Sequence, residues 1–454
     1  MTTRPLLIDE DGKVHRNLSV PLAINVRPVD SEATTILYYC RPTGSDTEGD
    51  GSHDYPWATL KHALEQLPWF HNGIRYRIDI TGCTESHAGG LVIPPFVAPY
   101  EVVTGGFDYS TYYFYATNLE IFAEPQVIET ITGAHILSQT IDPVTGMLTV
   151  TTDLTMTPHA YRGMPIFGDA LGEMAAIADN DATKLYIPYY GWFALTAPLY
   201  ITEYGAEIIN SDVASPKPAL SGQGIRTSLL LAGIKMTTTN PAVKSFIISD
   251  SQLIETLFCR LGGCYLDTNR FFVSFFCNFD GVDGNNGLVT YGAGGFMIEN
   301  GLMYNGKPAI HGGFVQNNYF YQMVFDTCDP VGGGGGSINV YALLDVENCW
   351  FKNARANALE FEGHGNAIVS NTIIEDSGGD AISAYNPGML KLTNVHGDGN
   401  VGIGLRIANG CQVQVGTVDV TGASDYKVGG NVVGTWLGFG SNEVDANSFS
   451  RLFS

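Results

Sequence analysis

Three consecutive stretches of 23 residues decide the fold. They read NCWFKNARANALEFEGHGNAIVS (348–370), NTIIEDSGGDAISAYNPGMLKLT (371–393) and NVHGDGNVGIGLRIANGCQVQVG (394–416). Two apolar rows follow the same period, two residues apart. The first row is Leu359, Ile382, Leu405 and Val428, and the second is Phe361, Ala384 and Ile407. A fixed period predicts a solenoid, and the i, i+2 spacing of the rows predicts strands that face a shared interior.

The residues that open these stretches, Asn348, Asn371 and Asn394, are continued at the same period by Thr417. We expect the asparagines to stack, because each buried amide then finds a partner one coil away. Residues 215–430 have room for about nine coils, or a rod roughly 45 Å long at ~4.8 Å per coil. The sequence therefore predicts an all-β protein, a right-handed parallel β-helix.

Residues 38–68 read YYCRPTGSDTEGDGSHDYPWATLKHALEQLP. A short β run enters a turn rich in Gly, Asp and Ser, and an apolar stripe then predicts a helix. The stretch resembles the N-terminal cap of pectate-lyase-like β-helix proteins, with an N-terminal cap helix that seals the open end of the solenoid. The matching residues are Tyr39, Gly44, Asp46, Gly51, Pro56, Trp57, Thr59, Leu60, Ala63 and Leu64.

Residues 125–210 interrupt the solenoid pattern. The segment YRGMPIFGDALGEMAAIADNDATKLYIP (161–188) resembles small β-barrel modules that are inserted into phage β-helix proteins. The residues that carry this resemblance are Gly163, Gly168, Gly172, Ile177, Asn180, Thr183 and Leu185. The alternative is an irregular segment of the β-helix with long loops.

These patterns divide the chain into five segments. Residues 1–37 are extended and predict an attachment arm, with a disordered tail as the alternative. Residues 38–124 form the cap and first coils, 125–210 the inserted β-barrel module, and 211–430 the β-helix. The apolar tail 431–454 predicts a C-terminal cap or a contact between subunits.

Composition limits the function classes. The chain carries 46 acidic against 23 basic residues, a net charge of −23, which argues against nucleic acid and an anionic membrane surface. It has no apolar run long enough to span a bilayer, so we expect no membrane insertion. The eight cysteines lack zinc spacing, so we expect buried thiols, no metal and no cofactor. With no signal peptide pattern at the N-terminus, we expect assembly in a host cytoplasm.

The cap and module resemblances together imply a tailspike or tail fibre of a tailed phage or phage-like particle. Such a protein is expected in the virion, as a homotrimer that contacts other tail proteins through residues 1–37 and recognises cell-surface glycan, with or without cleaving it. One alternative is a stand-alone polysaccharide lyase or glycoside hydrolase. Another is a structural spike that has no enzymatic activity.

Two aromatic strands look apolar on both faces. One carries Phe271, Phe272, Phe275, Phe276 and Phe279, and the other Tyr319, Phe320, Tyr321 and Phe325. Because a solenoid strand needs only one apolar face, we expect a subunit interface to cover the other; the alternative is a platform on which sugars stack.

Glycoside cleavage requires two carboxyl groups in one cleft, ~5 Å apart in retaining enzymes and ~6.5–9.5 Å apart in inverting enzymes. The densest acidic stretch supplies the candidate catalytic residues Glu360, Glu362, Glu375, Asp376 and Asp380. Lys352 and Arg406 stack near them, and we expect them to neutralise these acids more than to orient a substrate. Gly363-His364-Gly365 and Arg406-Ile407 resemble polygalacturonase motifs, but the paired carboxylates of that family are missing, and Asp345 stands alone near the expected coil.

Overall fold

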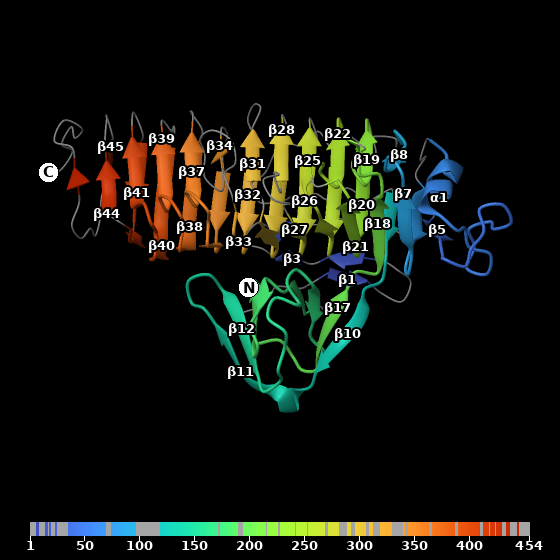
Figure 1. Ribbon diagram of the computed structural model, residues 1–454, viewed down its shortest axis with the longest axis horizontal. Helices are drawn as coiled ribbons and strands as arrows, with labels where there is room; N and C mark the ends of the chain where they lie inside the picture. The colour runs from blue at the N-terminus through green and yellow to red at the C-terminus, as the bar shows by residue number, and fades with distance from the viewer. Residues whose placement is uncertain are drawn as a thin grey trace.

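The protein is a long parallel β-helix, and a smaller module of antiparallel strands lies against one side of it (Figure 1). The computed structural model describes residues 6–8, 14–16, 18–19, 23–24, 35–69, 74–96, 119–170, 173–188, 194–214, 216–225, 228–240, 242–251, 253–267, 271–280, 288–291, 296–305, 308–311, 318–328, 339–340, 344–362, 366–385, 389–408, 412–416, 418–422, 424–428, 433–435 and 443–444. A 22-stranded sheet and a 12-stranded sheet form the rod. The prediction of a parallel β-helix is confirmed.

Each coil, one turn of the solenoid, holds up to three strands that pair in parallel with those of the next coil. The first strands are β6 (Arg75–Asp79), β9 (Leu119–Phe122), β20 (Ser228–Ala232), β23 (Leu253–Leu257), β26 (Phe271–Phe275), β29 (Phe296–Glu299), β32 (Asn318–Tyr321), β35 (Leu344–Glu347), β42 (Gln412–Val415) and β45 (Val433–Thr435). The second strands are β7 (Thr84–His87), β18 (Ala206–Asn210), β21 (Ile234–Thr238), β24 (Arg260–Leu261), β27 (Asn278–Asp280), β30 (Leu302–Tyr304), β33 (Val324–Asp326), β36 (Trp350–Lys352) and β43 (Val418–Val420). In two coils β38 (Asn366–Glu375) and β40 (Met389–Gly397) run through both positions.

The third strands form the 12-stranded sheet, one for each coil. They are β8 (Leu91–Ile93), β19 (Leu220–Gln223), β22 (Phe246–Ser249), β25 (Cys264–Asp267), β28 (Leu288–Tyr291), β31 (Pro308–His311), β34 (Asn339–Val340), β37 (Leu359–Glu362), β39 (Ile382–Tyr385), β41 (Ile403–Ala408), β44 (Ser424–Val428) and β46 (Glu443–Val444). Nine coils, from β20 to β44, lie within residues 215–430, as the period predicts.

The predicted apolar rows line the interior, with one exception at the end. Leu359, Ile382 and Leu405 are in register and fully buried. The next coil is shorter, however, so Leu405 pairs with Tyr426. Val428 therefore pairs with Ile407 of the second row, and its assignment to the first row is wrong.

The corner between first and second strands explains the asparagine repeat. Asn348, Asn371 and Asn394 have φ angles of 55°, 48° and 55°, in the left-handed region that asparagine tolerates better than most residues. The Asn394 side-chain amide donates to Asn371 Oδ1 at 2.9 Å, which confirms the ladder for that pair. Thr417 lies outside the described residues. Other coils place Phe258, Phe276, Asn300 and Gln322 in the same conformation.

A cap covers the N-terminal end of the rod. Helix α1 (Leu60–Gln66) buries Leu60, Ala63 and Leu64 in the core that continues through the coils (Figure 1). Asp46 Oδ1 accepts hydrogen bonds from the Ala58 and Thr59 amides at 2.8 and 3.0 Å. Strand β5 (Thr35–Tyr39) pairs with β6, so the rod begins inside the predicted arm 1–37.

The inserted module, residues 126–203, leaves the rod between β9 and β18, the first and second strands of one coil. One antiparallel sheet joins β10 (Gln126–Ile131), β17 (Leu199–Glu203), β13 (Pro165–Phe167) and β14 (Met174–Ala176). The other joins β11 (Ile136–Ile141), β12 (Met147–Thr152), β16 (Lys184–Pro188) and β15 (Asp179–Asn180), and a 3-10 turn (Gly133–His135) connects the two. Both sheets contribute to one apolar core. Closure into a barrel stays a prediction.

The module, not another subunit, covers part of the outer aromatic face. Phe167 and Met174 of the module pack against a cluster on the rod that contains Phe275 and Phe276. A second contact joins Met147 and Ala178 to the outer face of β30 and β33. The explanation of this face by a subunit interface is therefore wrong for these residues, and the homotrimer loses that support.

Short strands β1 (Leu6–Ile8), β2 (Val14–Arg16), β3 (Leu18–Ser19) and β4 (Ala23–Ile24) are described in the N-terminal arm. At the other end, β45 and β46 extend both sheets beyond residue 430. The seven described cysteines are buried free thiols, as expected, and Cys411 lies outside the described residues. Within the described ranges, no helix has the length and apolarity needed to cross a bilayer.

Candidate functional site

Two of the predicted catalytic acids, Glu360 and Asp380, are tied into the rod. Asp380 is 6% exposed, and its carboxylate accepts two hydrogen bonds from the Arg406 guanidinium and one from the Ile403 amide. Glu360 is 4% exposed and accepts a hydrogen bond from the Asn357 side chain at 2.9 Å. Buried, hydrogen-bonded carboxylates of this kind suit a structural role.

Glu375 and Asp376 lie at a different corner, at the end of β38. Glu375 accepts a hydrogen bond from the Trp350 indole at 3.0 Å. Burial raises the pKa of Glu375, and the charges of Asp398, Asp376 and Asp142 add to the effect, while the Trp350 hydrogen bond opposes it. Asp376 is exposed. Glu362 lies in β37, but its side chain and residues 363–365 of the polygalacturonase-like motif lie outside the described residues.

Lys352 neutralises acids other than those expected. Its ammonium lies 3.3 Å from Asp179 Oδ2 of the module and 3.3 Å from Asp326 Oδ2 of the rod. Arg162 of the module reaches the same two carboxylates, at 2.9 and 3.5 Å. Burial opposes ionisation of Asp179, but hydrogen bonds from Arg162 and His159 and the charge of Lys352 lower its pKa to about 2. This four-residue network, Arg162, Asp179, Asp326 and Lys352, fastens the module to the rod.

A second group of acids lies on the outer face of the first strands. We call Glu299, Tyr319, Asp345 and Glu347 the acid strip. Asp345 and Glu347 alternate with buried Leu344 and Val346 along β35, so both point outward. In register, Tyr319 lies one coil below Asp345, and Glu299 lies two coils below Glu347. The Tyr319 hydroxyl donates to Glu347 Oε2 at 3.1 Å.

The environment of the acid strip raises the pKa of two of its carboxyl groups. Burial, reinforced by the charge of Glu347, raises the pKa of Asp345 to about 6, although Lys391 opposes the shift. Glu299 is 2% exposed, and burial together with Glu347 raises its pKa to about 8. Asp345 and Glu347 are half-buried and reach solvent. The strip therefore places a carboxyl group with a raised pKa beside a second carboxyl group, an arrangement suited to general acid–base chemistry.

The geometry also fits a known spacing. The Cα atoms of residues i and i+2 on one strand lie roughly 6.5–7 Å apart, and side chains that leave the same face at this spacing can place their carboxyl groups in the ~6.5–9.5 Å range of inverting glycosidases. Sequence reasoning missed this pair because it chose the densest acidic stretch of the chain and treated Asp345 as isolated. The alternation of Leu344, Asp345, Val346 and Glu347 was the available signal. Of the described residues, no cluster of three His, Cys, Asp or Glu side chains is placed to hold a metal ion.

Comparisons with known proteins find distant structural likeness. No protein-family model and no curated protein matches the sequence. Among solved structures, the Gp54 tailspike of Acinetobacter baumannii bacteriophage AP22, in complex with A. baumannii capsular saccharide, is 11% identical over 79% of this chain, with a TM-score of 0.23. This chain covers 64% of that tailspike's length.

Two further structures extend the comparison. GH136 lacto-N-biosidase from Eubacterium ramulus is 10% identical over 90% of this chain and 67% of its own, with a TM-score of 0.28. The tailspike protein gp49 from Pseudomonas phage LKA1 is 11% identical over 84% of this chain and 72% of its own, with a TM-score of 0.19. At this distance the assignment of the fold rests on the strand pairing described above.

Proposed function

We propose that the protein recognises cell-surface polysaccharide and hydrolyses it at the acid strip. The carrying observation is the Asp345–Glu347 pair, two carboxyl groups that leave the same outward face of β35 two residues apart, one of which has a pKa of about 6. In this proposal Asp345 protonates the leaving oxygen, and Glu347 activates a water molecule on the opposite face of the sugar. Tyr319 orients Glu347 through its hydroxyl group.

The substrate class comes from the sequence resemblance to phage β-helix proteins, and the residues come from the geometry. The same resemblance motivates three further proposals: a homotrimer, attachment to other tail proteins through residues 1–37, and a place in a virion after assembly in the host cytoplasm. The five acids Glu360, Glu362, Glu375, Asp376 and Asp380 remain a competing proposal for the catalytic centre.

The test measures digestion of surface polysaccharides by the full chain and by Asp345→Asn, Glu347→Gln and Asp376→Asn. We expect the first two variants to lose at least 100-fold in rate and to keep polysaccharide binding. Asp376→Asn is the matched control, since it removes one exposed carboxylate of the competing set. Loss of digestion in this variant alone would move the centre to the competing set. Retention of anomeric configuration in the product would contradict the inverting assignment.

A further inference from the structure

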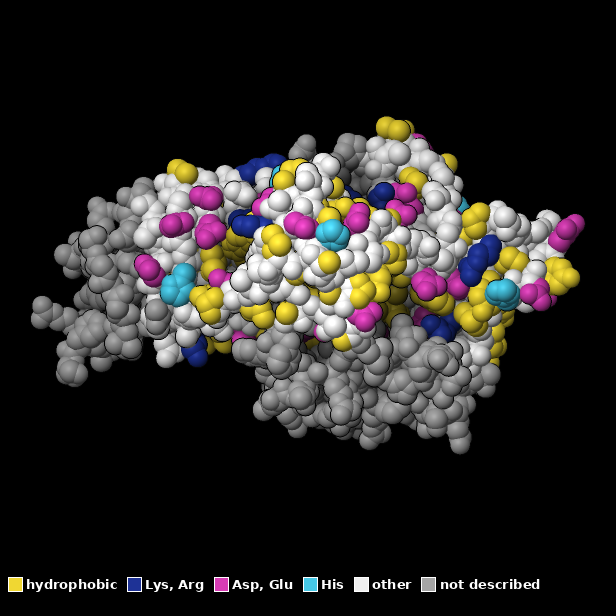
Figure 2. All heavy atoms as spheres, turned by 90° about the horizontal axis from the view of Figure 1, so that it is seen from below, with side chains coloured by type: hydrophobic (Ala, Val, Ile, Leu, Met, Phe, Trp, Pro, Cys, Tyr) yellow, Lys and Arg dark blue, Asp and Glu magenta, His cyan; other side chains and the backbone are white. Residues whose placement is uncertain are grey.

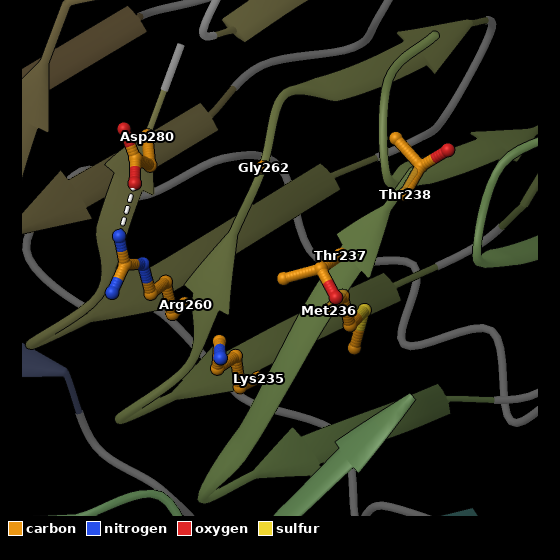
Figure 3. Close-up of a pocket in the computed structure, with 7 residues that line it drawn as sticks. All are labelled: Lys235, Met236, Thr237, Thr238, Arg260, Gly262 and Asp280. Carbon is orange, nitrogen blue, oxygen red and sulfur yellow. Dashed lines mark hydrogen bonds and ion pairs between the residues drawn. The ribbon is translucent and has the colours of Figure 1, made fainter. Parts of the chain in front are cut away.

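A cavity of about 280 Å³ opens on the outer face of the second strands, away from the acid strip. Figure 3 shows its lining: Lys235, Met236, Thr237, Thr238, Arg260, Gly262 and Asp280. β21 supplies Lys235 and β24 supplies Arg260, and these two are in register on adjacent coils. The cavity lies near the foot of the module, where the Tyr204 hydroxyl, close to Arg260, donates to the Gly163 carbonyl.

The sequence explains why space remains here. Two residues further along the strands, three successive coils carry Thr237 on β21, Gly262 after β24 and Asp280 on β27. Gly262 has no side chain, so the outer face is open at this position between Thr237 and Asp280. A hollow therefore forms, with hydroxyl, carboxylate and cationic groups around it.

The two cationic side chains in the cavity can donate hydrogen bonds to a ligand. Arg260 pairs with Asp280, and Lys235 lies 2.8 Å from Glu207 Oε1. Each cation keeps further N–H groups beyond these pairs, since guanidinium has five donors and ammonium three. Both side chains are about one-third exposed, at 35% and 34%. Figure 3 shows Arg260 and Lys235 on adjacent strands, with the Arg260 guanidinium turned toward Asp280.

Two like charges on neighbouring rungs are unfavourable by themselves, and they occur here in a chain of net charge −23. Figure 2, viewed from the module side, shows acidic side chains scattered over the surface and basic side chains in a few small groups. Each cation is already paired with one carboxylate, so an anion here would bind through the N–H donors of Lys235 and Arg260 that lie beyond these pairs. Glu207 and Asp280 beside them disfavour a dianion and can accept hydrogen bonds from sugar hydroxyls.

We propose that this cavity binds the carboxylate of an acidic sugar, such as a uronic acid unit, with Arg260 and Lys235 as the anion ligands. Thr237, Thr238 and the flanking carboxylates contact the hydroxyls of the ring. This inference rests on the proposed recognition of glycan, but it requires no cleavage and lies on a different face from the acid strip. It adds a site with two cations, balanced by two carboxylates, to an acidic surface.

The test uses the full chain and three probes: glucuronate, its uncharged methyl ester, and inorganic phosphate. Binding is measured by saturation-transfer NMR and titration calorimetry. We expect glucuronate to bind at least tenfold more tightly than the ester, and Arg260→Gln and Lys235→Gln each to weaken it at least tenfold. Arg355→Gln and Lys61→Gln remove the same charges at exposed positions and should leave binding unchanged.

Three results would overturn the proposal: no binding of glucuronate to the unaltered chain, equal binding of glucuronate and its ester, or unchanged binding in both cavity variants. Tighter binding of phosphate than of glucuronate would also overturn it, in favour of a phosphate site. The ester comparison uses the unaltered chain, so it stands even where a variant fails to fold. Polysaccharide digestion, measured separately on Asp345→Asn, keeps the outcome for the proposed function distinct.

Discussion

Replacing Lys352 by methionine should loosen the module from the rod. The ammonium lies 3.3 Å from each of two carboxylates, Asp179 and Asp326, whose side chains are 10% and 3% exposed. Methionine keeps the length and apolar stem of the side chain but leaves both acids short of one positive charge. Removing one partner of a buried ion pair costs about 3–5 kcal/mol. Because Arg162 still contacts both acids, we expect the lower end, about 3 kcal/mol.

Hydrogen exchange at the module–rod interface measures this local opening directly, which suits a long rod that does not unfold in two states. A loss of about 3 kcal/mol corresponds to an increase of about 100-fold in exchange rates for amides that are protected only while the module contacts the rod. Lys61→Met, at an exposed position of α1, is the control and should change nothing.

A double variant tests the cause. Lys352→Met combined with Asp326→Asn removes one of the two uncompensated charges, so it should exchange more slowly than Lys352→Met alone. An increase of less than tenfold in the single variant would refute the assigned cost. A double variant no slower than the single would show that the charges of Lys352 and Asp326 are not coupled.

Four other predictions follow from the same structure. The depressed pKa of Asp179 stabilises the module contact fully above about pH 4, and this contribution is lost as pH falls toward 2; proteolysis of the module should accelerate over that range. Glu299 has a raised pKa, so it costs stability as pH rises from about 4.5 to about 8, and Glu299→Gln should flatten the fall in melting temperature between pH 5 and 8. Ile382→Leu should be tolerated, whereas Ile382→Asp should cost several kcal/mol, roughly the price of a carboxyl group in a dry stack, and lower the melting temperature. Native mass spectrometry should find a trimer; a stable monomer at micromolar concentration would contradict this.

The rod was predictable because the repeat is shared between coils. Asn371 and Asn394 are 23 residues apart because each coil needs a residue with a positive φ angle at the same corner. The end of the first apolar row was not predictable, since Leu405 pairs with Tyr426, only 21 residues on. A coil shorter by two residues leaves the in–out alternation of the strand unchanged. Val428 therefore still matches an apolar position at the period of 23, and the sequence does not reveal the shift.

The acid strip escaped prediction for a related reason. Glu299, Tyr321 and Glu347 share one column, although they are separated by 22 and then 26 residues. A fixed period of 23 cannot align them, because corner loops of different length separate these coils. The density of acids along the chain pointed instead to residues such as Asp380, whose partner Arg406 becomes visible only when the coils are stacked.

The position of the module has a consequence for how the chain folds. It separates β9 from β18, yet both belong to one coil and pair with the same neighbouring coils. Joining them across about 80 unstructured residues would cost about 4 kcal/mol of loop-closure entropy. The first and last strands of the module pair with each other, Gln126 opposite Glu203. A module that folds first therefore brings the two ends together, and growth of the rod from the N-terminal cap past this coil should wait for it.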